Sequence, residues 1–222
     1  MRRPMNGIRA VVFDVGETLV DETAIWNDWA DWLEVPRFTF QATLGGVIAR
    51  GLEHQVAFDL LRPGIDLEAE ERARRAAGRR SSITDEDFYP DAVACLRAMT
   101  EANYLVGIAA NQPETTEAVL HALDVRLALV ASSARWGLSK PDPAFFDRIC
   151  EELRLASREI AYIGDRLDND IQPAAAAGMT AVFLRRGPWG YLQAATTDPS
   201  SVGAAATIDT LTDLPEVLRS LA

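Results

Sequence analysis

The sequence predicts an α/β fold, in which a Rossmann-like parallel sheet is wrapped by helices and a helical cap domain is inserted after the first strand. Three observations lead to this prediction: short apolar runs recur along the chain, helical stretches separate them, and one long helical segment follows the first run. This alternation is typical of parallel strands covered on both faces. The 222 residues suffice for one large core and a smaller second domain.

The first apolar run, residues 8–13 (IRAVVF), ends directly before Asp14. Similar strand patterns follow at 104–111, 127–132, 159–165, 180–186 and, more weakly, 205–209. Helical patterns occupy 91–102, 114–123, 142–153, 169–178 and 214–222. Active residues of a parallel sheet collect where the carboxyl ends of its strands lie. Four polar residues fall at such ends: Asp14, Asn111, Ser132 and Asp165.

The segment from residue 21 to residue 89 is too long for a simple connection within a compact domain. Its pattern predicts a helix over 23–35 that stops at Pro36, a second over 39–61 and a third over 67–78. We therefore expect a helical cap domain at 21–89. The core domain would comprise residues 1–20 and 90–222.

Two side-chain patterns stand out in this cap segment. Trp26, Trp29 and Trp32 lie three residues apart on one helical stripe, which favours packing between helices. The arginine-rich run at 72–75 follows glutamates at a spacing of four residues, which favours a solvated face of paired charges. Arg79 and Arg80 lack such glutamate partners and are the better candidates for contacting a substrate.

Composition and charge narrow the class of partner. The chain has 33 acidic and 22 basic residues, with a net charge of -11, so we expect neither nucleic acid nor a membrane as a partner. No window has the length and apolarity of a membrane span, and we expect no export signal in the opening residues. The two cysteines have no metal-binding spacing, which favours a reducing compartment. We expect a cytoplasmic monomer or homodimer.

The charged residues at the strand ends suit one kind of chemistry. Asp14 follows the first strand, Lys140 lies in GLSKPDPAFF, and Asp165 and Asp170 lie in YIGDRLDNDIQPAAAAGM. Three carboxylates and one ammonium form a site for a hard cation together with a phosphate. A carboxylate that attacks a phosphoryl group meets like-charge repulsion, which magnesium and a lysine offset.

With these blocks and FYPDAVACLRAM, the sequence resembles the haloacid dehalogenase superfamily, in particular its phosphatase-like members with a helical cap after the first strand. The resemblance implies that Asp14 attacks phosphorus and forms an aspartyl phosphate, which water then hydrolyses. It implies that Lys140 balances the charge of this aspartate and of the phosphate. It also implies a small phosphorylated metabolite as the substrate.

The resemblance further implies a magnesium ion. Its ligands would be Asp14, the backbone carbonyl of Gly16 and Asp165, while Asp170 would hold a metal-bound water or orient Lys140.

The FDVGETL segment matches the family less fully. Gly16 replaces an aspartate that acts as general acid and base, a role that contributes about 100-fold to 10,000-fold. Ala110 replaces a serine or threonine that binds a phosphate oxygen, and the neighbouring Asn111 can partly substitute for it in substrate binding. Glu17 is either a replacement for the missing aspartate or a solvated turn residue. We therefore expect a phosphatase with weakened acid and base catalysis.

Two alternatives remain open from the sequence. In a 2-haloacid dehalogenase Asp14 would attack carbon without a metal, and Asn111 resembles an asparagine of those relatives. They usually carry a bulky aromatic residue at the Gly16 position, however, and Asp165 and Asp170 are typical of the metal-dependent members. The other alternative is a catalytically impaired protein whose fold serves as a binding module.

Overall fold

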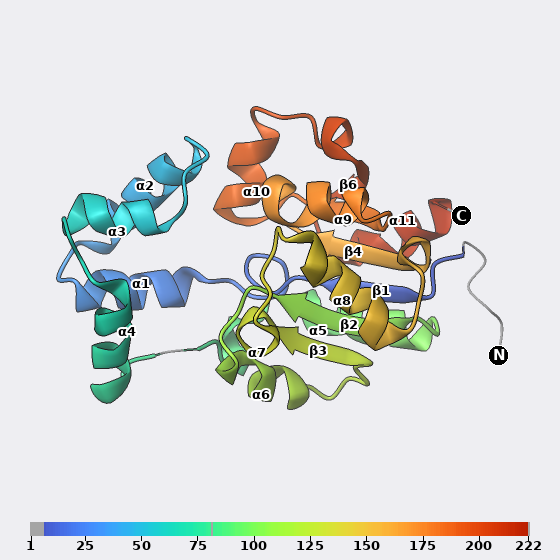
Figure 1. Cartoon of the computed structure of the whole chain (residues 1–222), viewed down its shortest axis with the longest axis horizontal. Coiled ribbons are helices and arrows are strands. Elements are labelled where there is room, and N and C mark those ends of the chain that lie inside the picture. Colours follow the sequence, from blue (N-terminus) through green and yellow to red (C-terminus); the bar gives the residue numbers. More distant parts are fainter. Residues whose placement is uncertain (1–6, 81, 222) are drawn as a thin grey trace. The chain divides into compact units, whose positions relative to one another are not determined.

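The computed structural model describes residues 7–80 and 82–221. It forms two compact units, a core that runs up to Val20 and resumes at Phe88, and a cap that comprises Asp21–Asp87 (Figure 1). The division after Asp87 lies two residues before the boundary predicted at residue 89.

The core contains a parallel sheet of six strands, in the order β3-β2-β1-β4-β5-β6. The strands are β1 (Ala10–Phe13), β2 (Leu105–Ala110), β3 (Leu129–Ser132), β4 (Ile160–Gly164), β5 (Thr180–Leu184) and β6 (Ala204–Ile208). All six were predicted, and the predicted fold class is confirmed. Because β1 lies between β2 and β4, the residues that follow these three strands meet at one edge of the sheet.

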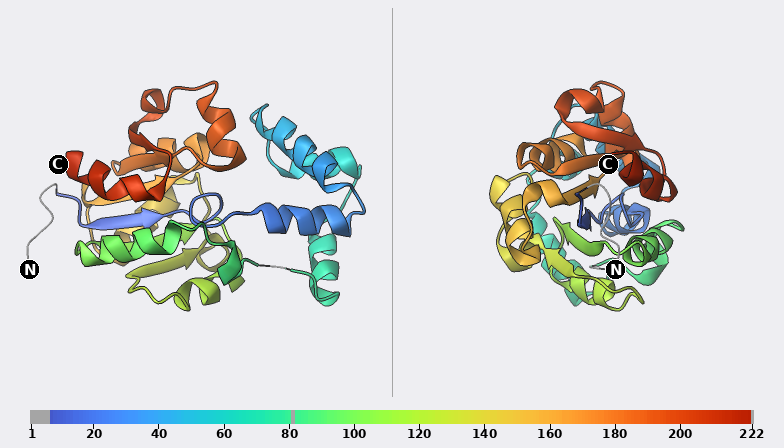
Figure 2. Two further views of the ribbon diagram at one scale, coloured as in Figure 1. Left: turned by 180° about the vertical axis from the view of Figure 1, so that it is seen from behind. Right: turned by 90° about the vertical axis from the view of Figure 1, so that its right-hand side faces the viewer.

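Helices cover both faces of the sheet (Figure 2). They are α5 (Ala92–Glu101), α6 (Thr115–His121), α7 (Ser133–Trp136), α8 (Pro143–Leu153), α9 (Gln172–Ala176), α10 (Gly187–Ala194) and α11 (Leu214–Ser220). The start of α8 follows from its sequence, since the Asp142 side chain accepts a hydrogen bond from the Ala144 backbone N–H at 2.9 Å and Pro143 is the first helical residue. No helix within the described part of the chain has the length and apolarity needed to cross a membrane.

Two helical segments of the core differ from the prediction. Helix α10 was not predicted, because Gly187, Pro188 and Gly190 obscure its pattern. The helix predicted at 169–178 is instead a π-type turn, Leu167–Ile171, followed by the short α9. That turn places Asp170 inside the core, where it is fully buried.

The cap contains four helices, α1 (Thr23–Trp32), α2 (Arg37–Ile48), α3 (Gln55–Leu61) and α4 (Leu67–Ala76). The single helix predicted over 39–61 is wrong, because the chain turns between α2 and α3. Gly51 lies in this turn with a φ of 66°, a conformation that glycine adopts at little cost. The tryptophan stripe packs inside the cap, as predicted: Trp26 stacks on Phe40 with 6.3 Å between ring centroids, and Trp29 meets Phe58 edge-on at 4.9 Å.

The predicted solvated face is confirmed for Arg72 and Arg75, which are exposed and pair with the glutamates four residues before them, but not for Arg74. Arg74 is 1% exposed, and its guanidinium donates to Asp28 and to Glu71, both at 2.6 Å. The guanidinium also lies 3.8 Å from the centroid of the Trp29 ring. Burial against an aromatic ring therefore decides the environment of Arg74, which the spacing of charges along α4 could not reveal.

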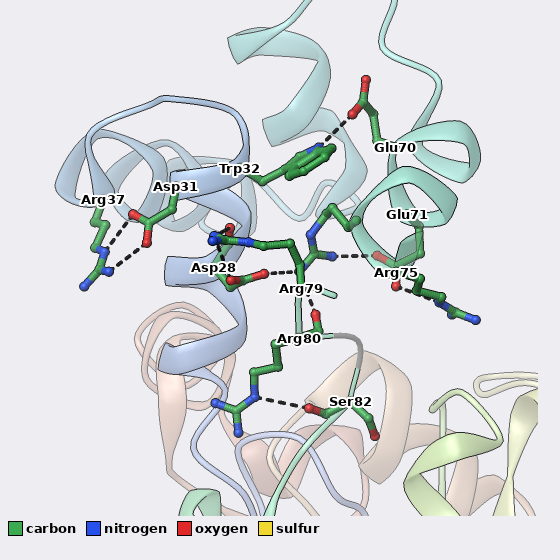
Figure 3. A network of polar contacts seen from close by, with 11 residues as sticks. Asp28, Asp31, Trp32, Arg37, Glu70, Glu71, Arg75, Arg79, Arg80 and Ser82 are labelled. Carbon is green, nitrogen blue, oxygen red and sulfur yellow. Dashed lines mark hydrogen bonds and ion pairs between the residues drawn. The ribbon is translucent and has the colours of Figure 1, made fainter. Parts of the chain in front are cut away.

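Arg79 and Arg80, the predicted candidates for substrate contact, each pair with an aspartate. Arg79 donates to Asp28 at 2.8 Å, and Arg80 donates to the backbone carbonyl of Ser82 (Figure 3). Arg80 also pairs with Asp87. These ion pairs join the end of the cap segment to α1 and to the residues before Phe88.

We expect Arg74→Met to lower the free energy of unfolding by about 1.5–3 kcal/mol, because it removes the charged hydrogen bonds of a buried guanidinium to Asp28 and Glu71. Arg75→Met is the matched control. Arg75 also pairs with Glu71, at 3.2 Å, but its side chain is 51% exposed, so its loss should cost about 1 kcal/mol or less. Urea denaturation measures both free energies of unfolding. Equal losses of stability in the two variants would contradict the claim that the burial of Arg74 makes it the more important residue.

Candidate active site

The ammonium of Lys140 lies at the centre of the predicted site. Its Nζ is 2.5 Å from Asp14 Oδ1 and 2.5 Å from Asp170 Oδ1. The three side chains come from the end of β1, the loop before α8 and the turn after β4. Burial opposes the charge of Lys140, but the carboxylates of Asp14 and Asp170 raise its pKa well above the ordinary value. Lys140 is therefore a permanently charged ammonium at this edge of the sheet.

Asn111 holds the backbone of Lys140. The Asn111 side-chain amide donates to the Lys140 carbonyl at 2.9 Å, and its carbonyl oxygen accepts from the Lys140 N–H at 2.8 Å. Both polar groups of this side chain are thus engaged with the chain itself. The Asn111 side chain therefore positions Lys140, and its role in binding substrate stays a prediction.

Asp170 is held on both sides. One oxygen accepts from Lys140, and the other accepts from the Arg166 N–H at 3.0 Å. Burial raises the pKa of Asp170 to about 6, although the Lys140 ammonium counteracts this. Gly164 leaves the room that Asp170 occupies, since a Cβ at Gly164 would overlap its carboxyl group.

Asp165, directly after β4, carries the clearest sign of a missing ligand. It is 2% exposed, and within the described chain its Oδ2 is buried without a hydrogen-bond partner. Burial raises its pKa well above the ordinary value, and the carboxylates of Asp170 and Asp14 raise it further. An unpartnered oxygen in such an environment is costly unless a cation offsets the charge.

The three carboxylates fit a divalent cation. Asp14, Asp165 and Asp170 each offer an oxygen, and these oxygens lie within 4.8 Å of one another. Hard cations such as Mg²⁺ prefer carboxylate and carbonyl oxygens as ligands. The donor set and the unpartnered oxygen of Asp165 therefore suit magnesium.

In the loop after Asp14, Glu17 and Thr18 are buried, which the sequence did not indicate. Glu17 is 5% exposed and accepts a hydrogen bond from the Tyr89 hydroxyl at 2.6 Å, so the expectation of a solvated turn residue is wrong. Thr18 Oγ1 is also buried without a hydrogen-bond partner within the described chain. No spacing rule signals either feature, because both depend on segments far away in the sequence.

Two other predicted positions contribute no polar side chain. Ala110, at the end of β2, is 1% exposed and has only a methyl group. Gly16 has no side chain, and its backbone lies beside Val20 in a single bridge. The Ser132 hydroxyl donates to Glu117 at 2.6 Å and caps α7, so it is engaged by these two groups.

Comparison with known proteins identifies the class of protein. The family model of haloacid dehalogenase-like hydrolases matches residues 8–178, so the chain belongs to this family. Membership confirms the resemblance seen in the sequence and the expectation of a hydrolase.

Similar proteins extend along nearly the whole chain. Glyceraldehyde 3-phosphate phosphatase from Methanopyrus kandleri is 29% identical and covers 97% of this chain and 99% of its own length. A phosphoglycolate phosphatase from Cupriavidus necator is 29% identical and covers 94% of this chain and 92% of its own length. A solved dehalogenase structure covers 95% of this chain and 96% of its own, with a TM-score of 0.66 and 23% identity, which supports the fold.

We expect Gly164→Ala to displace the Asp170 carboxyl from Lys140, because the new Cβ would occupy its place. The predicted cost is about 1–3 kcal/mol of stability. Gly45→Ala in α2 is the control, since nothing lies within 4 Å of its Cβ position and alanine favours a helix by about 0.5–1 kcal/mol. Urea denaturation of both variants tests this, and a Gly164→Ala protein as stable as the wild type would contradict it.

Proposed function

We propose that the enzyme is a magnesium-dependent phosphatase that hydrolyses a small phosphorylated metabolite in the cytoplasm through an aspartyl phosphate at Asp14. The observation that carries this proposal is the contact of Lys140 with Asp14 and Asp170, beside the unpartnered oxygen of Asp165. The relatives named as phosphatases, which align along more than nine-tenths of the chain, support a phosphate ester as the substrate.

In this mechanism the carboxylate of Asp14 attacks phosphorus, and the bond between phosphorus and the leaving oxygen breaks. Lys140 stabilises the negative charge on the phosphoryl oxygens, while Asp170 and Asn111 hold Lys140 in place. Water then attacks the phosphorus of the aspartyl phosphate and restores the Asp14 carboxylate. Asp14, Asp165 and the Gly16 carbonyl would hold a magnesium ion, which supplies positive charge that offsets repulsion between carboxylate and phosphate.

Because Gly16 offers no acid, the leaving oxygen must take its proton from solvent. Leaving groups that need no protonation, such as phenolic or acyl phosphates, should therefore react faster than alkyl phosphates. The same lack of a base should prolong the life of the aspartyl phosphate.

Dehalogenation is a less well supported candidate. The Asn111 side chain, which suggested it, is engaged by the Lys140 backbone. Three buried carboxylates beside one ammonium also suit a cation, which dehalogenation at carbon would not need.

Asp14→Asn should abolish magnesium-dependent release of phosphate from p-nitrophenyl phosphate, because the amide cannot act as the nucleophile. Asp209→Asn is the matched control, since Asp209 is exposed, pairs with Arg185 and should leave the rate unchanged. A colorimetric phosphate assay with Mg²⁺ or with chelator measures both.

Full activity of Asp14→Asn, or of the wild type in chelator, would contradict the proposal. Halide release from a 2-haloacid in chelator would favour dehalogenation instead.

Gly16→Asp should raise kcat/KM on an alkyl phosphate by about 100-fold, the lower end for a general acid and base. The value of kcat/KM on an aryl phosphate should change little, because kcat/KM reports the departure of the leaving group, which needs no proton there. Gly16→Asn controls for side-chain size without acidity and should show no gain. An equal gain for both substrates, or an equal gain from asparagine, would overturn this explanation of Gly16.

A further inference from the structure

Glu17 adopts an unusual conformation in the loop that follows Asp14. Its φ is 52°, in the left-handed region that residues other than glycine rarely occupy. Its N–H donates to the Val20 carbonyl at 2.8 Å, and the side chain is buried. Such a conformation persists where the surroundings fix it, often at functional sites.

The surroundings that fix Glu17 come from two distant segments. The Tyr89 hydroxyl donates to Glu17 Oε2 at 2.6 Å. On the other side lies Gly187, where a Cβ would stand 2.5 Å from Glu17 Oε2 and 2.6 Å from its Cγ. Only glycine at position 187 therefore leaves room for this side chain. We call the space between Tyr89 and Gly187 the Glu17 seat.

Arg186 anchors the Glu17 seat. Its guanidinium lies 4.2 Å from the centroid of the Tyr89 ring and donates to the Thr18 carbonyl at 3.1 Å. The same guanidinium pairs with Asp91. Arg186 directly precedes Gly187. It therefore links Gly187 to Tyr89 and to the loop that contains Glu17.

The carboxylate of Glu17 acts on the cluster of acidic residues. Burial raises the pKa of Asp165, and neighbouring carboxylates, Glu17 among them, raise it further. Gly16 brings no charge to this cluster, and its direct neighbour Glu17 brings one. The loop thus retains one carboxylate, directly after position 16, which has none.

We propose that Glu17 is a positioning residue of the cation site: held between Tyr89 and Gly187, it fixes the loop that carries the Gly16 carbonyl and adds a negative charge to that loop. The carboxylate is placed outside the ligand set, because the carboxylate oxygens that lie within 4.8 Å of one another come from Asp14, Asp165 and Asp170. It strengthens the binding of a divalent cation from outside the ligand set, as carboxylates around metal sites commonly do. This inference rests on the proposed magnesium site.

Calorimetric titration with MgCl₂, without substrate, tests the proposal. Glu17→Gln keeps an oxygen for the Tyr89 hydroxyl but loses the charge, so its dissociation constant should rise by about 10-fold. Thermal unfolding in chelator should match the wild type, since the hydrogen bond is kept. A dissociation constant within about twofold of the wild type would overturn the proposal.

A second arm disturbs the seat without changing Glu17. Gly187→Ala should weaken Mg²⁺ binding as much as Glu17→Gln, because the new Cβ displaces the Glu17 side chain. Gly137→Ala is the matched control: both glycines have a φ of 64°, but nothing lies within 4 Å of the Cβ position at Gly137. Gly137→Ala should bind Mg²⁺ as the wild type does. If Gly187→Ala and Gly137→Ala lose the same affinity for Mg²⁺, the proposed role of the Glu17 seat is wrong.

The double variant Glu17→Gly with Gly187→Ala completes the cycle. It should bind Mg²⁺ no more weakly than Glu17→Gly alone, because the displaced side chain is already absent. Effects that multiply would show that Gly187 acts through something other than Glu17, against the proposal.

Asp165→Asn separates this inference from the proposed function. If this variant binds Mg²⁺ as the wild type does, the proposed metal site is wrong and the role of Glu17 falls with it. If Asp165→Asn loses binding while the Glu17 variants retain it, only the role of Glu17 is wrong.

Discussion

The site depends on one buried ammonium shared by two carboxylates. Lys140 Nζ contacts Asp14 and Asp170 at 2.5 Å each, in a region where isolated charges are unstable. Three segments must meet to form these contacts, and the strand order makes this possible by placing β1 between β2 and β4. Asn111, at the end of β2, then fixes the Lys140 backbone. The sheet thus brings together charges that no single segment could hold.

The same arrangement leaves an excess of negative charge. Three carboxylates surround one ammonium, and Asp165 Oδ2 is without a hydrogen-bond partner among the described residues. A divalent cation is the simplest group that satisfies this oxygen and offsets repulsion among the carboxylates. The loop after Asp14 adjusts this balance, because Gly16 provides no charge while the buried Glu17 does. In this account Glu17 supplies negative charge to the loop, while the residue at position 16 decides whether an acid and base is present for proton transfer.

Sequence predicted the parts of this structure that follow from local pattern. The six strands are short apolar runs, and Asp14 and Asp165 lie at their ends, so their approach to one another followed from parallel pairing. Features fixed by tertiary contact were missed. Charge spacing on α4 did not indicate that Arg74 packs against Trp29, and glycines concealed both α10 and the turn at Gly51. The sequence left the role of Glu17 open, because its seat is built from Tyr89 and Gly187, far along the chain.

A crystal structure of the enzyme with MgCl₂ and trifluoroberyllate, a mimic of an aspartyl phosphate, tests the central claim most directly. The account predicts beryllium attached to a carboxylate oxygen of Asp14, Lys140 in contact with its fluorides, and Mg²⁺ bound by Asp165. Trifluoroberyllate on another residue, or Mg²⁺ bound away from Asp165, would contradict it.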